Sequence, residues 1–266
     1  MVYREFWDAT DEDEEKPQKI LTLEQLAQKD DFTDALITMG PEIIKEILAE
    51  YGMKLSDKDL TIPVFIFNQE SRQGVAEIIG HSTENLDGQF VLELGIIYIF
   101  IYENIIRTIE AYFHEYIHQL GDNINAKTEN YDLRITGYLM EMNHGDGKIE
   151  RGEFLEETIT DYLAIKMAQR FLERSGNILT EEEIIEISGS EAYAFFNEAL
   201  EIIWLNDQEI ELRMIQARFN RRLLGKLRHA LTDRYGQGAL RILVRANFNV
   251  LEIAKIVFYL TRNRRN

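Results

Sequence analysis

The sequence predicts an α+β fold, with a small antiparallel sheet in the first half of the chain and mainly helices after it. Three runs rich in Val, Ile and Phe predict strands, and turn residues separate them. From Glu103 onward the apolar residues recur at helical spacing almost to the end of the chain. The predicted strands are residues 61–68 (TIPVFIFN), 74–82 (GVAEIIGHS) and 89–94 (QFVLEL).

Two helical patterns precede the predicted sheet. The first runs from about Thr22 to Lys29. The second begins after Thr33, is broken near Gly40-Pro41 and ends at Gly52, because Gly and Pro interrupt or terminate helices.

The composition indicates a folded, helix-rich chain that is not held together by disulfides. Of the 266 residues, 45% are hydrophobic, three are proline and none is cysteine. The lack of cysteine excludes a disulfide framework, a thiolate nucleophile and any metal site built on sulfur.

The start of the chain is acidic and has no apolar h-region, so we expect no secretory signal. Residues 8–17 (DATDEDEEKP) are so highly charged that we assign them no structure and expect residues 1–20 to be an acidic, flexible N-terminus. The longest apolar stretch, residues 95–102, is far short of the roughly 20 residues that span a bilayer. We therefore expect a cytoplasmic protein with no membrane partner.

Residues 103–123 (ENIIRTIEAYFHEYIHQLGDN) carry the pattern that indicates chemistry, because they contain HExxH. At about 100° per residue, His114 and His118 lie together on one strip of the helix, beside an apolar arc. Two imidazoles one turn apart can point at one ion, while Glu115 projects to the side where a metal-bound water would sit. Gly121 then supplies a helix stop. The apolar arc consists of Ile106, Ile109, Phe113, Ile117 and Leu120.

Catalytic zinc usually takes a third protein ligand. The metzincin pattern HExxHxxGxxH fails here, because Ile124 occupies the ligand position. Residues 152–176 form another helical pattern, on which Glu157 and Asp161 lie one turn apart and two alanines continue the same face. Small residues on that face let this helix approach the HExxH helix closely. Glu157 can then ligate the ion, while Asp161 accepts a hydrogen bond from a ring N–H of a ligand histidine.

HEYIH followed by EETITD resembles the motifs of the gluzincin metallopeptidases, the thermolysin-like clan, whose second motif is written NExxSD. The resemblance implies a zincin-like fold, one zinc ion per chain and hydrolysis of peptide bonds in a peptide or protein substrate. It maps His114, His118 and Glu157 onto the zinc ligands. It also maps Glu115 onto the general base and Asp161 onto the carboxylate that supports a ligand histidine.

The specific match covers about residues 103–121 and 153–168. Glu156 replaces the asparagine of the second motif and Thr160 replaces its serine. The gap from His118 to Glu157 is longer than in thermolysin. No particular member of the clan is indicated.

The resemblance also implies a division of the chain and a set of accessory residues. We expect a zincin catalytic core over residues 21–178 and a helical C-terminal lobe over residues 179–266, with a cleft between them. The run 89–94 is the candidate for a strand that lies antiparallel to bound substrate. The candidates for stabilising the transition state are Tyr131, Tyr138, His144 and His229.

Other interpretations of the same residues remain open. His144 is the rival third ligand, in an arrangement that resembles the SprT-type proteases acting on DNA–protein crosslinks, and Glu156 or Glu153 are further alternatives. Glu141 and His144 form a second ExxH pair, the type that ferritin-like di-iron bundles use. The fold could also serve as a binding protein without activity.

Residues 142–153 match part of the EF-hand loop pattern. Met142 and His144 stand where the first and third oxygen ligands are needed. A turn that leads into the Glu157 helix is the plainer interpretation.

Charge is unevenly distributed along the chain, whose net charge is −18. Residues 211–266 contain 13 basic and three acidic residues, a local charge of +10, which leaves −28 on residues 1–210. The large negative charge does not favour a nucleic-acid partner. We hypothesise that some C-terminal arginines line the cleft and favour acidic substrates or a C-terminal carboxylate: Arg213, Arg218, Arg221, Arg222 and Arg228.

Overall fold

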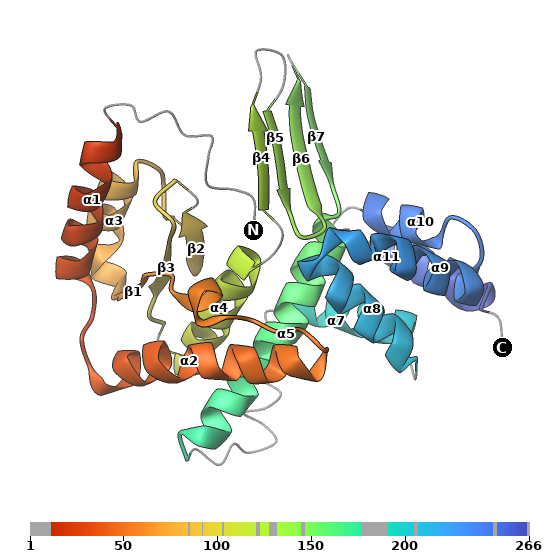
Figure 1. Ribbon diagram of the computed structural model, residues 1–266, viewed down its shortest axis with the longest axis horizontal. Coiled ribbons are helices and arrows are strands. Elements are labelled where there is room, and N and C mark those ends of the chain that lie inside the picture. The colour runs from red at the N-terminus through yellow and green to blue at the C-terminus, as the bar shows by residue number, and fades with distance from the viewer. Residues whose placement is uncertain are drawn as a thin grey trace.

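The protein, described by a computed structural model, is an α+β protein with two small sheets set into a mostly helical chain (Figure 1). The structure describes residues 12–84, 86–91, 93–102, 104–120, 123–127, 132–144, 147–176, 191–204, 207–246 and 249–264. In these residues the helices are α1 Glu12–Leu26, α2 Asp31–Glu50, α3 Arg72–Ile79, α4 Ile105–Leu120, α5 Glu153–Arg174, α7 Glu191–Trp204, α8 Gln208–Phe219, α9 Leu224–Tyr235, α10 Ala239–Arg245 and α11 Val250–Arg262. The strands are β1 Val64–Phe67, β2 Gly88–Val91, β3 Ile96–Phe100, β4 Asn123–Lys127, β5 Asp132–Thr136, β6 Leu139–His144 and β7 Gly147–Arg151.

The first sheet differs from the predicted one in topology. Its strand order is β1-β3-β2, with β1 parallel to β3 and β2 antiparallel to β3. The expectation of a purely antiparallel sheet is therefore wrong. The central strand β3 is buried along its whole length, which explains its uninterrupted run of apolar residues.

Residues 72–79 form the helix α3, where the sequence predicts a strand over residues 74–82. Val75, Ile78 and Ile79 recur at i, i+3 and i+4, so the same apolar residues also satisfy the helical period. Val75 is fully buried, and Gly80, with φ +83°, ends the helix. A short apolar run can fit both the helical period and the strand period. The surface on which the run packs then decides which structure it forms.

Residues 12–20 belong to α1, so the expectation of a flexible segment is wrong for them. Glu, Lys, Gln and Leu dominate this helix and are good helix formers. Leu23 is fully buried in a small core that α1 shares with α3 and the first sheet. Apolar side chains such as Leu23 and Ile20 therefore dock a highly charged helix on this core. Residues 1–11 lie outside the described part of the chain.

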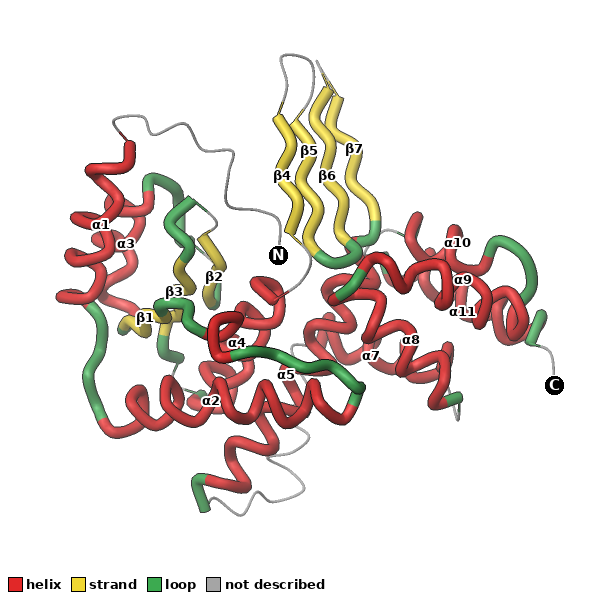
Figure 2. The backbone as a smooth tube through the Cα atoms, viewed as in Figure 1, coloured by secondary structure: helices red, strands yellow, loops and turns green. Residues whose placement is uncertain are grey.

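The described residues between 123 and 151 form a second sheet, where the sequence predicts helix. Its four strands β4 to β7 pair in chain order as an antiparallel meander that stands out from the helices (Figure 2). Leu133 and Ile135 on β5 lie opposite Met142 and Met140 on β6. These apolar residues alternate with a period of two, which is the signature of a strand, so the helical interpretation of this segment is wrong.

The second sheet also bears on two alternative interpretations of the sequence, the di-iron bundle and the EF-hand loop. Glu141 and His144 lie on β6, so the di-iron bundle, which needs such a pair on a helix, is wrong. The described residues between 142 and 153 belong to the antiparallel pair β6–β7 and to the start of α5, and not to the helix–loop–helix of an EF-hand. This pair leads directly into the helix that carries Glu157.

α2 runs continuously through Gly40-Pro41, where the sequence predicts a break. A Cβ atom at Gly40 would lie 2.5 Å from Cε1 of Tyr112 on α4. The glycine therefore permits the close approach of α2 to α4. Gly52, with φ +71°, follows the end of the helix, as predicted.

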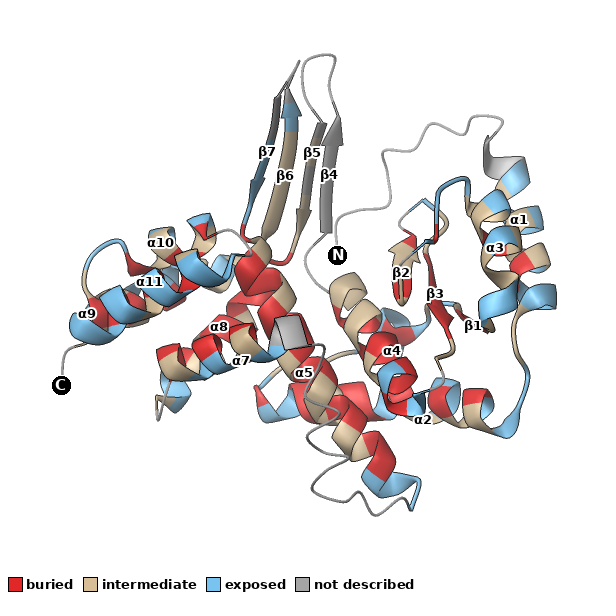
Figure 3. Ribbon diagram, turned by 180° about the vertical axis from the view of Figure 1, so that it is seen from behind, coloured by how far each residue is buried: buried red, intermediate tan, exposed pale blue. Residues whose placement is uncertain are grey.

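The main core lies where α2, α4 and α5 pack together. α4 buries four residues of the predicted apolar arc, with Leu120 partly buried at its end. α5 lies along α4, and its Ala164 and Ala168 are fully buried, as expected for a close approach of the two helices. Figure 3 shows the buried faces of both helices in the centre of the molecule.

The C-terminal helices pack on α5 through α7 and α10, and α11 packs on α7. Two polar caps divide the expected helical C-terminal lobe. Asp207 accepts a hydrogen bond from the Ile210 N–H at the start of α8, and Asn220 accepts one from the Arg222 N–H before α9. Residues 180–187, which are also predicted to be helical, lie outside the described residues. In the described part of the chain, no helix is both long enough and apolar enough to cross a bilayer.

The close contact at Gly40 predicts an unusual response to alanine. Gly40→Ala should lower the free energy of unfolding by about 1–3 kcal/mol, because its Cβ collides with the Tyr112 ring in a packed core. Gly74→Ala, in α3, is the matched control, because its Cβ would meet only Leu26 Cδ1 at 3.7 Å. The control should be neutral or stabilising by up to about 1 kcal/mol. Urea unfolding measures both values, and equal effects of the two substitutions would contradict the packing argument.

Candidate metal centre

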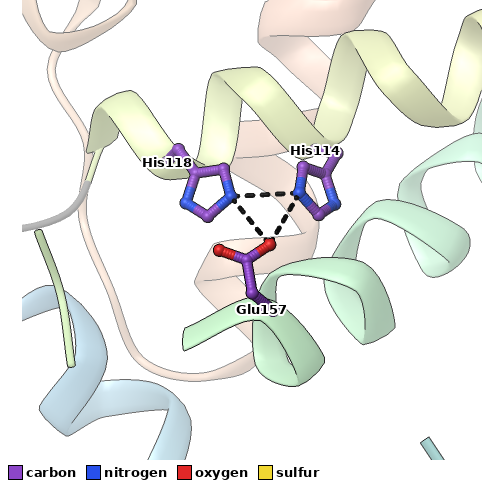
Figure 4. A group of neighbouring side chains, drawn as sticks. All are labelled: His114, His118 and Glu157. Carbon is purple, nitrogen blue, oxygen red and sulfur yellow. Dashed lines mark hydrogen bonds and ion pairs between the residues drawn. The ribbon is translucent and has the colours of Figure 1, made fainter. Parts of the chain in front are cut away.

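Three side chains from two helices converge on one point. His114 and His118 extend from α4, and Glu157 extends from α5 between them (Figure 4). The two histidine Nε2 atoms lie 3.0 Å apart. Oε2 of Glu157 lies 3.4 Å from Nε2 of His114 and 3.5 Å from Nε2 of His118.

The triangle formed by these atoms has the dimensions of a zinc site. Ligands held at about 2.0–2.1 Å around a tetrahedral ion are about 3.3–3.4 Å apart. The side chains of His114, His118 and Glu157 retain 17%, 16% and 21% of their exposure, so the group is reachable from one side. Among the described residues, it is the group of His, Asp and Glu side chains that could hold a metal ion. Two nitrogen donors and one carboxylate with an accessible face fit a catalytic zinc ion.

Local structure explains why the three donors meet. The histidines are four residues apart on α4, so they project from the same face. Glu157 lies in the second turn of α5, whose start is fixed at Gly152, with φ +84°. A Cβ atom at Gly152 would lie 2.1 Å from the carbonyl oxygen of Tyr138, just before β6. Only glycine therefore allows the backbone to come this close to Tyr138.

In this group, the carboxylate and the imidazoles each stabilise the charged form of the other. Burial alone would lower the pKa of His118, but the neighbouring Glu157 and Glu156 carboxylates outweigh it and raise this pKa to about 10. Burial alone would raise the pKa of Glu157, but His118 and His114 outweigh it and hold this pKa well below its usual value. A carboxylate that stays ionised beside two imidazoles provides the negative charge that a divalent cation needs.

Glu156 supports His118 from the side opposite the triangle. Its Oε1 lies 3.1 Å from Nδ1 of His118, so it can accept the ring N–H and leave the Nε2 lone pair directed at the triangle. Glu156 is fully buried and forms an ion pair with Arg218, which is also fully buried. Glu156 is therefore the partner of the imidazole and not a member of the triangle, in contrast to its interpretation as an alternative ligand.

Asp161, to which the sequence assigns the support of a histidine, lies one turn beyond Glu157. It accepts a hydrogen bond from Nδ2 of Asn197 on α7 and shares another with Glu110 on α4. Burial raises the pKa of Asp161, and the charge of His114 opposes that rise. Asp161 thus lies within the electrostatic reach of His114, and its role toward that ring stays a prediction.

Glu115 is oriented by the edge of the first sheet. Its Oε2 accepts a hydrogen bond of 2.9 Å from the Phe90 N–H on β2. A Cβ atom at Gly88 would lie 3.2 Å from Cγ of Glu115, so a glycine permits this side chain to lie against the strand. The expected general base and the expected substrate strand are therefore in direct contact.

The remaining candidates are not gathered at the triangle. The hydroxyl of Tyr138 is buried and donates to the carbonyl of Met214 at 2.8 Å, which does not favour a role in catalysis. His144 is the last residue of β6, and five residue steps place its backbone roughly 16 Å from Leu139 at the near end of the strand. This position does not favour His144 as a third ligand. His229 lies on α9, where its Nδ1 contacts the Gly225 carbonyl at 2.7 Å, and Tyr131 lies outside the described residues.

The C-terminal arginines have separate environments. Arg218 is fully buried, so the hypothesis that it lines a substrate cleft is wrong for this residue. Arg221 donates to the Gly137 carbonyl at 3.0 Å. Arg213 pairs with Glu209 and lines a cavity of about 430 Å³ between α8 and α9. Arg222 and Arg228 are exposed.

Two parts of the site were not predicted from the sequence. The Arg218–Glu156 pair joins residues far apart in the chain, and one basic residue among many in a helix gives no signal of burial. The bond from Phe90 to Glu115 involves a backbone N–H, which every residue except proline carries. Only the departure of Glu156 from the asparagine of the gluzincin motif pointed to this position.

No family model, curated protein or solved structure matches this chain.

Glu110 and Asp161 predict a pH-dependent contribution to stability. Burial and the neighbouring Asp161 raise the pKa of Glu110 to about 9, so the folded state retains a proton that the unfolded state loses above about pH 4.3. This contribution is fully present at low pH and is lost as the pH rises toward 9. Glu110→Gln keeps a neutral hydrogen-bonding group, so its Tm should exceed that of the wild type by an amount that grows between pH 5 and 9.

Thermal melts at several pH values measure this difference. Glu24→Gln, at an exposed position of α1, is the control and should shift Tm equally at every pH. A Glu110→Gln difference that is constant across the range would contradict the assignment of the retained proton.

Proposed function

We propose that this chain is a zinc-dependent metallopeptidase with a zincin-like fold, in which His114, His118 and Glu157 hold one zinc ion. The observation that carries the proposal is the triangle of donor atoms, with edges of 3.0, 3.4 and 3.5 Å. Two of its corners lie on an HExxH helix, whose glutamate lies beside them. The resemblance to the gluzincin motifs supports the same assignment.

The edge of the first sheet supports a peptide as the substrate. β2 is an edge strand, and the carbonyl groups of Asp87, just before the strand, and of Val91, its last residue, accept hydrogen bonds on the β3 side. By alternation, Gly88 and Phe90 present their backbone groups outward, toward the helix that carries Glu115. The Phe90 N–H already donates to Glu115, so an extended peptide can add to this edge through its remaining main-chain groups, which would bring the carbonyl groups of the peptide past the site.

The residues of the chain have distinct roles in the proposed hydrolysis. A zinc ion held by the triangle would supply Lewis acidity toward water and toward the scissile carbonyl group. Glu115 takes the proton from the attacking water and delivers it to the departing amine, so the C–N bond breaks with no net change in the protein. The Phe90 N–H holds the Glu115 carboxylate on the substrate side of the helix. Glu156 fixes the tautomer of His118.

The ligand set predicts the effect of three substitutions on zinc content. The wild type should bind about one zinc per chain. His118→Ala and Glu157→Ala should bind almost none, because each removes one corner of the triangle. His144→Ala should retain the wild-type content, and it is the control that tests the SprT-type alternative. Elemental analysis of the purified proteins gives these values, and a normal zinc content in Glu157→Ala would overturn the ligand set.

The mechanism predicts that Glu115→Gln separates metal binding from turnover. The amide cannot accept the proton, so cleavage in a peptide library should fall by about 10²–10⁴-fold while the zinc content stays unchanged. A chelator should abolish wild-type cleavage, and added zinc should restore it. If zinc binds to the wild type and no peptide is cleaved, the chain is a binding protein with this fold. If Glu115→Gln cleaves at the wild-type rate, the proposed proton transfer is wrong.

A further inference from the structure

Arg218 is a fully buried cation at the back of the candidate metal centre. It lies on α8, and its side chain has no exposed surface. One guanidinium nitrogen donates to Oε1 of Glu156 at 2.5 Å, and the other donates to the backbone carbonyl of Ile117 at 3.0 Å. Both bonds go to groups next to His118. Ile117 precedes this residue in the chain, and Glu156 contacts its ring.

The bond to Ile117 stabilises the C-terminal end of α4, the helix that carries the histidines. α4 ends at Leu120, so the Ile117 carbonyl is one of the last four, which have no partner within the helix. A cation at this position satisfies the carbonyl and interacts favourably with the negative end of the helix dipole. Arg218 therefore stabilises the last turn of α4, in which His118 lies.

The bond to Glu156 belongs to a buried network of hydrogen bonds. Oε1 of Glu156 contacts Arg218 and Nδ1 of His118, while Oε2 accepts the Tyr138 N–H at 2.9 Å. Gly137, with φ +53°, allows this approach, because a Cβ atom there would lie 2.2 Å from Oε2 of Glu156. Both oxygens of the carboxylate are thus held in place by groups from α8, α4 and the β5–β6 turn.

Burial of these charges is costly unless every partner is present. Removing one member of a buried ion pair leaves an uncompensated charge, which is strongly destabilising. An apolar pair would fill the same space without this cost, so the pair is not required merely for packing. Its distinctive consequence is the fixed position of the carboxylate against the imidazole of His118.

We propose that Arg218 is a positioning residue for the metal centre, which holds Glu156 against His118 and fixes the end of α4. This inference rests on the proposed zinc site, and it makes docking of the C-terminal helix α8 a condition for tight metal binding. Arg218 does not contact the triangle itself, so its effect is transmitted through Glu156 and the backbone of α4.

The test compares zinc affinity in the full-length chain, measured by competition with a chelator. Arg218→Met, which keeps an unbranched chain but removes both bonds, should weaken zinc binding by about 10–100-fold. Arg218→Lys should have a smaller effect, because one ammonium group can replace only part of the hydrogen bonding of the guanidinium group. Arg213→Met is the matched control on the same helix, where the partly exposed arginine pairs with Glu209 at 3.6 Å, and it should bind zinc as the wild type does.

A second readout distinguishes positioning from general loss of stability. The visible spectrum of the Co²⁺-substituted protein reports ligand geometry, and it should change in Arg218→Met and not in Arg213→Met. Glu156→Gln removes the carboxylate with little change in shape and should reproduce both effects. The double variant Glu156→Gln/Arg218→Met should lose less affinity than the two separate losses combined, because both residues act through one contact.

The outcomes are separable from those of the proposed function. Zinc affinity and a Co²⁺ spectrum of Arg218→Met that match those of Arg213→Met would overturn the positioning role while leaving the peptidase proposal intact. If Arg218→Met and Arg218→Lys do not fold, Glu156→Gln decides, and zinc affinity within about twofold of the wild type would overturn the inference. A wild-type chain that binds no zinc would instead refute the proposed function on which the inference rests.

Discussion

The close packing of α4 along α5 is the constraint on which the rest of the structure depends. The two histidines lie on α4 and both supporting glutamates lie on α5, so a small change in the separation of these helices would move every donor at once. Ala164 and Ala168 of α5 are fully buried, and α5 packs along α4. Gly40 lets α2 approach the Tyr112 ring of α4. Small residues at the contacts therefore set the geometry of the site.

The consecutive residues Glu156 and Glu157 make different contacts, because the helix separates their side chains by about 100°. Glu157 faces the Nε2 atoms of both histidines, whereas Glu156 faces Nδ1 of His118 from the interior. Placing two carboxylates beside one imidazole would be unfavourable without a cation. Arg218 provides this cation, and the resulting ion pair is removed from water.

The basic C-terminal segment contributes to the fold in a way that its net charge does not reveal. A local charge of +10 indicates a surface that attracts anions, yet Arg218 has no exposed surface and Arg221 is bound to a backbone carbonyl. Positive charge in this segment therefore has at least two uses, of which one is internal. Net charge describes long-range attraction, but burial determines which charges can take part in it.

The sequence by itself determined the helical HExxH strip, the second helix with Glu157 and the mixed α+β composition, because these depend on spacing within one element. Tertiary structure decided the features that depend on contacts between distant segments. The run around Val75 became a helix and the segments β4 to β7 became a sheet, since short apolar patterns fit either period until a packing surface selects one. The same reason applies to Glu156. The sequence shows it only as one carboxylate next to another, whereas its contacts with His118 and with a buried arginine exist only in the folded chain.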